Sequence, residues 1–165
     1  MGEVGQGDSR RIDNDENRYD GDKDDARICM NRSDDARMNE ASLTLLYTNA
    51  QSLVNKVNEL KAITAINNPD LIIVTETWTN ESITNQLLDI DGYDVVERKD
   101  RNDTLMGRGG GIVVYAKKDL YAWKEECDTV FNQCGMIGVK RNNRDLYVVA
   151  IYRSPNSTKT NDDNL

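Results

Sequence analysis

Short apolar stretches separated by polar residues run along the chain from residue 43 onward. Between residues 43 and 49, Leu43, Leu45 and Tyr47 alternate with polar neighbours, which is the period-two pattern of a β-strand. From residue 53 the apolar residues recur every three or four positions, and this spacing predicts an amphipathic helix that stops before the Asn-Asn-Pro at residues 67–69. The apolar stripe of this helix consists of Leu53, Val57, Leu60, Ile63 and Ile66.

A continuous apolar run follows the helix directly. Residues 71–74 read Leu-Ile-Ile-Val, the pattern of a strand that is covered on both faces. A strand, a helix and a second strand in this order predict a parallel strand pair. Further strands are expected at residues 93–97, 112–116, 136–140 and 146–152, with residues 141–144 as a hairpin turn between the last two. The sequence therefore predicts a mixed sheet and an α/β (α+β) fold.

The composition divides the chain into a tail, residues 1–41, and a folding part, residues 42–165. The first 40 residues hold ten apolar, twelve acidic and seven basic side chains, too little apolar surface to offset the entropy of ordering. We therefore expect residues 1–41 to form a disordered acidic tail. This tail carries −5 of the formal net charge of −8, so −3 remains for the folding part. Overall charge does not indicate nucleic-acid binding, and a DNA contact would need a local basic patch.

The cysteines and the lack of transport signals only exclude certain kinds of site and protein. Cys29, Cys127 and Cys134 are an odd number without Cys-x-x-Cys spacing and the chain has no histidine, so we expect neither a disulfide nor a zinc site. No stretch approaches roughly 18 apolar residues, and residues 1–30 hold no apolar signal core. We expect a soluble, intracellular protein without a membrane partner, and the sequence indicates no protein partner.

Two polar residues follow the two strands that are predicted to be parallel. Asn49 ends the first strand, and Glu76 comes two residues after the buried run. If the strands are neighbours, their ends bring the amide and the carboxylate together, a pair of hard oxygen ligands suited to Mg²⁺ beside a phosphate. Each residue also has an ordinary interpretation, Asn49 as a helix cap and Glu76 as a solvated loop residue.

Three glycines at residues 109–111 precede the strand expected at residues 112–116. They lack the Gly-Lys-Ser/Thr ending of a phosphate-binding loop, and they permit instead a tight entry into the strand and a close approach of the backbone. The nearby basic residues can contact a DNA backbone or form a solvated basic loop. These residues are Arg98, Lys99, Arg101 and Arg108.

Four motifs occur in series along the folding part: Asn-Ala-Gln-Ser-Leu at 49–53, Pro-Asp-Leu-Ile-Ile-Val-Thr-Glu-Thr-Trp at 69–78, Arg-Gly-Gly-Gly-Ile at 108–112 and Ile-Tyr-Arg-Ser-Pro at 151–155. Their order and spacing resemble the endonuclease domain of non-LTR retrotransposons, which belongs to the endonuclease/exonuclease/phosphatase superfamily. The resemblance covers about residues 43–160. It implies the N-terminal half of a four-layer αββα sandwich of the deoxyribonuclease-like type.

The resemblance also implies roles for individual residues. Asn49 would orient the phosphate and a metal-bound water, Glu76 would ligate Mg²⁺, and Tyr152 would place its hydroxyl near the scissile phosphate. The metal ligands would thus be Glu76 and Asn49, and Mg²⁺ would bind weakly. Substrate DNA would contact Arg108, Arg153 and Asn156.

Residues that the family carries in its second half are not recognisable in this sequence. That half supplies an Asp-x-Asn motif and a terminal Ser-Asp-His, whereas this chain has no histidine, and its Asp-Asp-Asn at residues 162–164 follows no apolar strand. We therefore expect a truncated, Mg²⁺-dependent DNA endonuclease module that is inactive alone. The alternatives are a non-catalytic folding or interaction remnant of that domain and a superfamily phosphatase. The motifs Arg-Gly-Gly-Gly and Tyr-Arg-Ser-Pro argue against the phosphatase.

Overall fold

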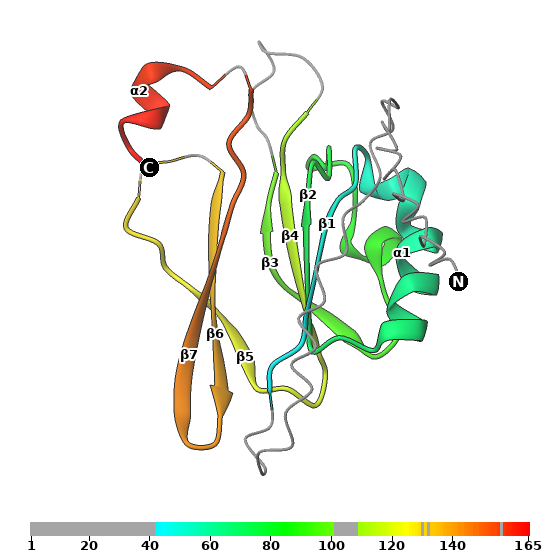
Figure 1. Ribbon diagram of the computed structural model, residues 1–165. Coiled ribbons are helices and arrows are strands. Elements are labelled where there is room, and N and C mark those ends of the chain that lie inside the picture. Colours follow the sequence, from blue (N-terminus) through cyan, green and yellow to red (C-terminus); the bar gives the residue numbers. More distant parts are fainter. Residues whose placement is uncertain (1–41, 101–108, 130, 132, 156) are drawn as a thin grey trace, which may run out of the picture.

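The computed structural model describes residues 42–100, 109–129, 131, 133–155 and 157–165 and shows two β-sheets packed face to face with a helix outside them (Figure 1). The predicted tail, residues 1–41, lies outside the described residues. So do Cys29, Arg101, Arg108 and Asn156. None of the described helices is long and apolar enough to cross a membrane.

The first sheet has four strands in the order β1 (Leu45–Asn49), β2 (Leu71–Thr75), β4 (Ile112–Lys117) and β3 (Tyr93–Lys99). β1 and β2 run parallel, as the strand-helix-strand pattern predicts, and the other neighbours are antiparallel. All five residues of β2 are buried, which explains why this strand is a continuous apolar run rather than an alternating one.

The second sheet is antiparallel, with the order β5 (Ala122–Glu125), β6 (Cys134–Arg141) and β7 (Arg144–Ile151). The predicted turn joins β6 to β7, and its two central residues, Asn142 and Asn143, have φ angles of 49° and 59°. Positive φ at both central positions is the requirement of a type I′ hairpin turn, and asparagine tolerates it better than most residues.

Helix α1 (Leu53–Asn67) covers the outer face of the first sheet. The amphipathic pattern predicts its length, but the prediction that Ile66 belongs to the buried stripe is wrong, because this side chain is 82% exposed. The buried position of the last turns belongs to Thr64 instead. Two short helical segments complete the described fold, η1 (Asn85–Leu88) and α2 (Lys159–Asp162).

Two apolar cores separate these layers. One lies between α1 and the first sheet and includes Leu53, Leu60, Ile72, Val74 and Tyr115. The other lies between the two sheets and includes Leu71, Ile73, Val114, Ile137 and Val139. The described residues thus form a helix layer and two sheets, the arrangement expected for part of a four-layer sandwich. No described helix covers the outer face of β7, where Tyr147, Val149 and Ile151 are 58%, 48% and 46% exposed.

Candidate functional site

The carboxyl ends of β1 and β2 meet at one edge of the first sheet. Asn49 pairs in register with Thr75, so Asn49 and Glu76 stand at neighbouring strand ends. The strand pairing continues past β1 through the backbone, since the Ser52 amide donates to the Glu76 carbonyl over 2.9 Å and the Leu53 amide to the Thr77 carbonyl over 2.9 Å. The helix-cap interpretation of Asn49 is wrong, because the residue that precedes α1 is Ser52.

The carboxylate of Glu76 is held from three sides. Its Oε1 accepts a hydrogen bond from the Tyr152 hydroxyl, and its Oε2 accepts one from the Trp78 indole over 2.7 Å and one from the Gly110 amide over 3.3 Å. Glu76 itself has a φ of 54°, in the left-handed region that side chains with a Cβ rarely adopt. The solvated-loop interpretation is therefore wrong for Glu76, which is half-buried and fixed by its neighbours.

The glycine run packs directly against this turn. Gly109, Gly110 and Gly111 have φ angles of 141°, 78° and 94°, and β4 begins with the next residue. The Trp78 amide donates to the Gly110 carbonyl over 2.9 Å, and a Cβ on Gly111 would lie 2.3 Å from the Thr77 Oγ1. The expectation that these glycines allow a tight strand entry and a close backbone approach is confirmed.

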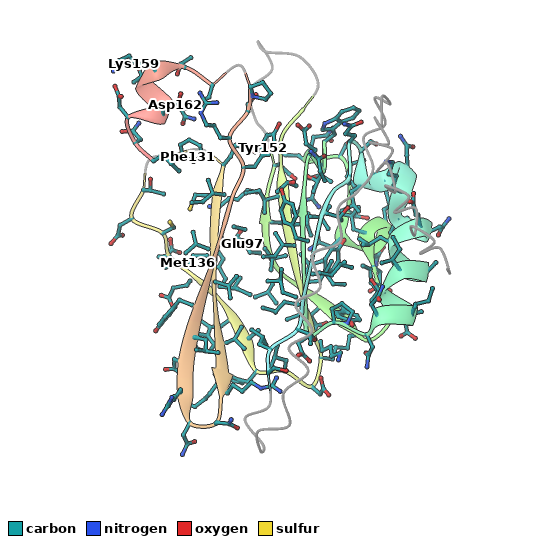
Figure 2. The ribbon with its side chains drawn as sticks, viewed as in Figure 1. Glu97, Phe131, Met136, Tyr152, Lys159 and Asp162 are labelled. Atoms are coloured by element: carbon teal, nitrogen blue, oxygen red, sulfur yellow. The ribbon has the colours of Figure 1, made fainter. Side chains whose placement is uncertain are left out.

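Gln133 links the two sheets at this edge, and the sequence pattern does not reveal it. The Gln133 side chain is 8% exposed, and its Oε1 accepts from the Gly111 amide over 2.7 Å. Its backbone carbonyl accepts from the Tyr152 amide over 2.9 Å. Figure 2 shows Tyr152 just past the end of β7 and close to the first sheet. One buried glutamine thus sets the position of both the glycine run and Tyr152.

Arg153 points to a different partner. Its guanidinium donates to both carboxylate oxygens of Asp162 in α2, over 3.1 and 2.7 Å. The hydrogen bonds from Arg153 and from Ser157 hold the pKa of Asp162 below its ordinary value. The first residue of the Asp-Asp-Asn sequence at 162–164 is therefore the partner of Arg153 in an ion pair. The other expected substrate contacts, Arg108 and Asn156, lie outside the described residues.

Arg98 neither lies in a solvated basic loop nor is placed to contact a DNA backbone, the two interpretations given to the basic residues. Its guanidinium donates to the Asp100 carboxylate over 2.8 and 2.9 Å and to the carbonyls of Asn80 and Ile83 over 2.7 Å each. These bonds tie the loop after β2 to the end of β3. Arg98 is thus committed to the fold and is not available to a DNA backbone.

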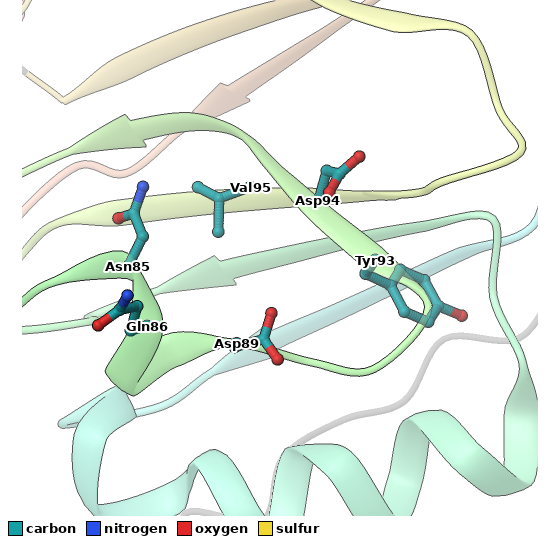
Figure 3. Close-up of a pocket in the computed structure, with 6 residues that line it drawn as sticks. All are labelled: Asn85, Gln86, Asp89, Tyr93, Asp94 and Val95. Atoms are coloured by element: carbon teal, nitrogen blue, oxygen red, sulfur yellow. The ribbon is translucent and has the colours of Figure 1, made fainter.

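A separate open hollow of about 510 Å³ lies between η1 and the start of β3 (Figure 3). Its walls carry the carboxylates of Asp89 and Asp94, and none of the site residues described above lines it. Because two carboxylates repel a phosphate, this hollow is a poor place for a nucleic-acid backbone. The strand edge around Glu76 is the better candidate.

The donors at this edge fit a weakly held Mg²⁺. Among the described residues, no group of three or more acidic, cysteine or histidine side chains could hold a metal ion. Glu76 nevertheless offers one carboxylate, which the hydrogen bonds from Tyr152, Trp78 and Gly110 hold in a fixed orientation. Mg²⁺ keeps most of its waters and needs only one or two protein carboxylates together with substrate phosphates.

Comparison with solved structures finds similar folds. The chain resembles an AP endonuclease from Leishmania major, with a TM-score of 0.57 and 17% identity over 82% of this chain and 47% of that protein. It also resembles the endonuclease domain of a telomere-specific non-LTR retrotransposon, with a TM-score of 0.49 and 14% identity over 69% of this chain and 47% of that domain. No protein-family model and no curated protein matches the sequence. The chain thus has an endonuclease-like α/β fold and spans about half the length of these two structures.

Proposed function

We propose that the strand ends around Glu76, called the Glu76 edge below, form the metal- and phosphate-binding part of a Mg²⁺-dependent phosphodiesterase that acts on DNA. The observation that carries this proposal is the Glu76 carboxylate, which receives hydrogen bonds from Tyr152, Trp78 and Gly110 at the carboxyl ends of two parallel strands. Ligands of open α/β sheets bind at this end of the strands. The similarity in fold to an AP endonuclease and the four motifs in series support the same reaction class.

Each residue has a role that follows from its place. Glu76 would hold the metal, because its carboxylate is oriented in advance and does not pay for ordering when the ion arrives. Bound Mg²⁺ would polarise a phosphoryl oxygen as a Lewis acid. Tyr152 orients the carboxylate through its hydroxyl. Asn49, exposed at the neighbouring strand end, supplies an amide that can donate to a phosphate oxygen.

We further propose that this chain alone does not cleave DNA. Hydrolysis needs a group that takes a proton from water, and loss of one such group typically costs about 10² to 10⁴ in rate. The chain contains no histidine, and the described residues contain no group of three acidic, cysteine or histidine side chains that could hold a metal ion. Binding of metal and phosphate should therefore be separable from turnover.

A second candidate is an interaction module without a substrate. The apolar side chains of Tyr147, Val149 and Ile151 on the outer face of β7 favour it, since a contiguous exposed apolar patch usually marks a contact surface. This candidate requires no metal at Glu76, so a metal titration separates the two proposals.

The test is a Mg²⁺ titration followed by NMR, with and without a short DNA duplex, on the wild type, Glu76→Gln and the control Glu81→Gln. Glu81 is an exposed carboxylate outside the site. We expect weak binding that DNA strengthens, that Glu76→Gln abolishes and that Glu81→Gln leaves unchanged. Metal-induced shifts that persist in Glu76→Gln would refute the site.

A plasmid-nicking assay on the same proteins tests the second half of the proposal. We expect no nicking above the buffer control from any of the three proteins. Nicking by the wild type that is lost in Glu76→Gln would confirm the site and overturn the statement that the chain alone is inactive.

A further inference from the structure

Two cysteines lie next to one another where β6 begins. The Sγ atoms of Cys127 and Cys134 are 3.1 Å apart, and both residues are free thiols. Cys134 is buried, with 5% exposure, whereas Cys127 is partly exposed on the segment that leads from β5 to β6. The spacing of the cysteines in the sequence gives no sign of this proximity, and the proposed function does not use it.

We propose that Cys127 and Cys134 are a redox modification site at which the two residues form a reversible disulfide with each other. The co-reactant is a low-molecular-weight disulfide, such as oxidised glutathione. A disulfide has a sulfur–sulfur distance of about 2.05 Å, so the two sulfur atoms need to approach by only about 1 Å. Their contact makes the oxidised form accessible.

The backbone decides which cysteine moves. Gly135, which follows Cys134, lies against Glu97, and a Cβ at Gly135 would be 2.9 Å from the Glu97 Cγ. Glu97 is 2% exposed, and Figure 2 shows it between the sheets. Cys134 is therefore fixed by the sheet packing. The approach must come from Cys127, whose segment lies outside the strands.

The chemistry proceeds in two exchange steps. The Cys127 thiolate attacks one sulfur of glutathione disulfide, a mixed disulfide forms, and one glutathione thiolate leaves. The Cys134 thiolate then attacks the Cys127 sulfur and expels the second glutathione. Both protein thiols lose their protons, the protein loses two electrons, and glutathione disulfide is reduced to two molecules of glutathione.

The second step should be the slow one. Burial, together with the hydrogen bond and the charge of Cys127, raises the pKa of Cys134 to about 11. Of the charged groups that face it, Glu97 acts in the same direction and Lys99 opposes it. Cys134 is thus mostly protonated at neutral pH. The rate of disulfide closure should rise as pH increases above 7, because the attacking thiolate becomes more abundant.

The disulfide would act on the strand edge through Gln133. Gln133 precedes Cys134 directly and holds the Gly111 amide through its side chain and the Tyr152 amide through its carbonyl. A bond between residues 127 and 134 restrains the segment that carries Gln133. Oxidation should therefore stabilise the folded chain and slow the exchange of the Gly111 and Tyr152 amides.

The test uses the full chain with Cys29→Ser, so that the third cysteine does not react, and compares it with the same chain carrying Cys127→Ser or Cys134→Ser. Each protein is equilibrated with oxidised glutathione and digested with trypsin. Both cysteines lie in one tryptic peptide, residues 125–140, between Lys124 and Lys140. In the Cys29→Ser chain, the parent, we expect this peptide to lose two hydrogens. In the chain that also carries Cys134→Ser it should keep one glutathione at Cys127, and in the chain that also carries Cys127→Ser it should stay unmodified.

The oxidised parent should melt on the order of 5 to 10 °C higher than the reduced parent, and a dithiol reductant should reverse the change. Neither measurement depends on metal or DNA, so the outcome is independent of the proposed function. Glutathione retained on the parent peptide, no modification at all, or a lower melting temperature of the disulfide form would each overturn the proposal.

Discussion

Replacing Gly111 with alanine should destabilise the fold by about 2 to 5 kcal/mol, through two costs that the structure separates. Gly111 has a φ of 94°, and a residue with a Cβ pays roughly 1 to 2 kcal/mol there. The new Cβ would also lie 2.3 Å from the Thr77 Oγ1, an overlap that forces side chain or backbone to move. Overpacking of this kind typically costs about 1 to 3 kcal/mol.

Gly92 provides a matched control. It has a φ of 82°, and a Cβ built there meets nothing within 4 Å. Gly92→Ala should therefore show the backbone cost alone, about 1 to 2 kcal/mol. Urea unfolding followed by circular dichroism gives both values, provided that the dependence of the free energy on urea is the same in each variant.

A double-mutant cycle with Thr77→Ala identifies the source of the second cost. Thr77→Ala removes the clashing hydroxyl and its hydrogen bond to Thr79, which is 3.0 Å long. In the Thr77→Ala background the Gly111→Ala change should cost about 1 to 3 kcal/mol less than in the wild type. Equal losses for Gly111→Ala and Gly92→Ala, or a cycle without coupling, would refute the argument that the glycine run is needed for close approach.

Two further substitutions test the ends of the sheets. Burial alone would raise the pKa of Asp70, but the hydrogen bonds from Thr44 and Lys117 prevail and lower it, so its stabilisation is present above the unfolded value of 3.8 and is lost as pH falls through the lower folded value. Asp70→Asn should therefore reduce the free energy of unfolding at pH 7, and the difference between variant and wild type should shrink below pH 3.8. Urea titrations of both proteins at pH 7 and below pH 3.8 measure this difference, and a difference that stays constant would count against the argument. In the β6–β7 turn, Asn143→Val should cost about 1 to 2 kcal/mol because φ is 59°, whereas Asn143→Gly should be neutral or slightly stabilising. Unfolding free energies that rank the two variants the other way would contradict the turn assignment.

Local signals account for the strands that the sequence predicts well. The apolar run of β2 and the two asparagines between β6 and β7 each specify structure within a few residues, so these elements begin and end close to their predicted bounds. β5 was not predicted, because Ala122–Glu125 is too short to show a period and becomes a strand only by pairing with β6. Ile66 fits the helical period, yet nothing among the described residues covers it there.

The candidate site divides along the same line. The placement of Asn49 and Glu76 at neighbouring strand ends follows from the strand-helix-strand order, which is a property of the local sequence. Gln133 could not be found in this way, because its role depends on contacts with Gly111 and Tyr152 in other strands and one of these uses its backbone. The roles of Asn49, Glu76 and Tyr152 in binding and catalysis remain predictions until the titration and nicking assays are done.

Backbone strain gives an independent reason to regard the Glu76 edge as functional. Among the described residues, positive φ angles away from this edge, glycines aside, occur at Asn68, Asn142 and Asn143, and asparagine tolerates this conformation. At the edge they occur at Gln51, Ser52, Glu76 and Trp78. Such residues cost of order 1 to 3 kcal/mol each and persist only where the surroundings fix them. Glycine or asparagine would relieve this cost, so stability does not explain the residues found here.

The backbone bonds from Ser52 and Leu53 to the Glu76 turn, and from Trp78 to Gly110, hold the strained conformation in place. Among the described residues, strain of this kind is confined to one edge, which supports the proposal that this edge is a pre-organised binding site.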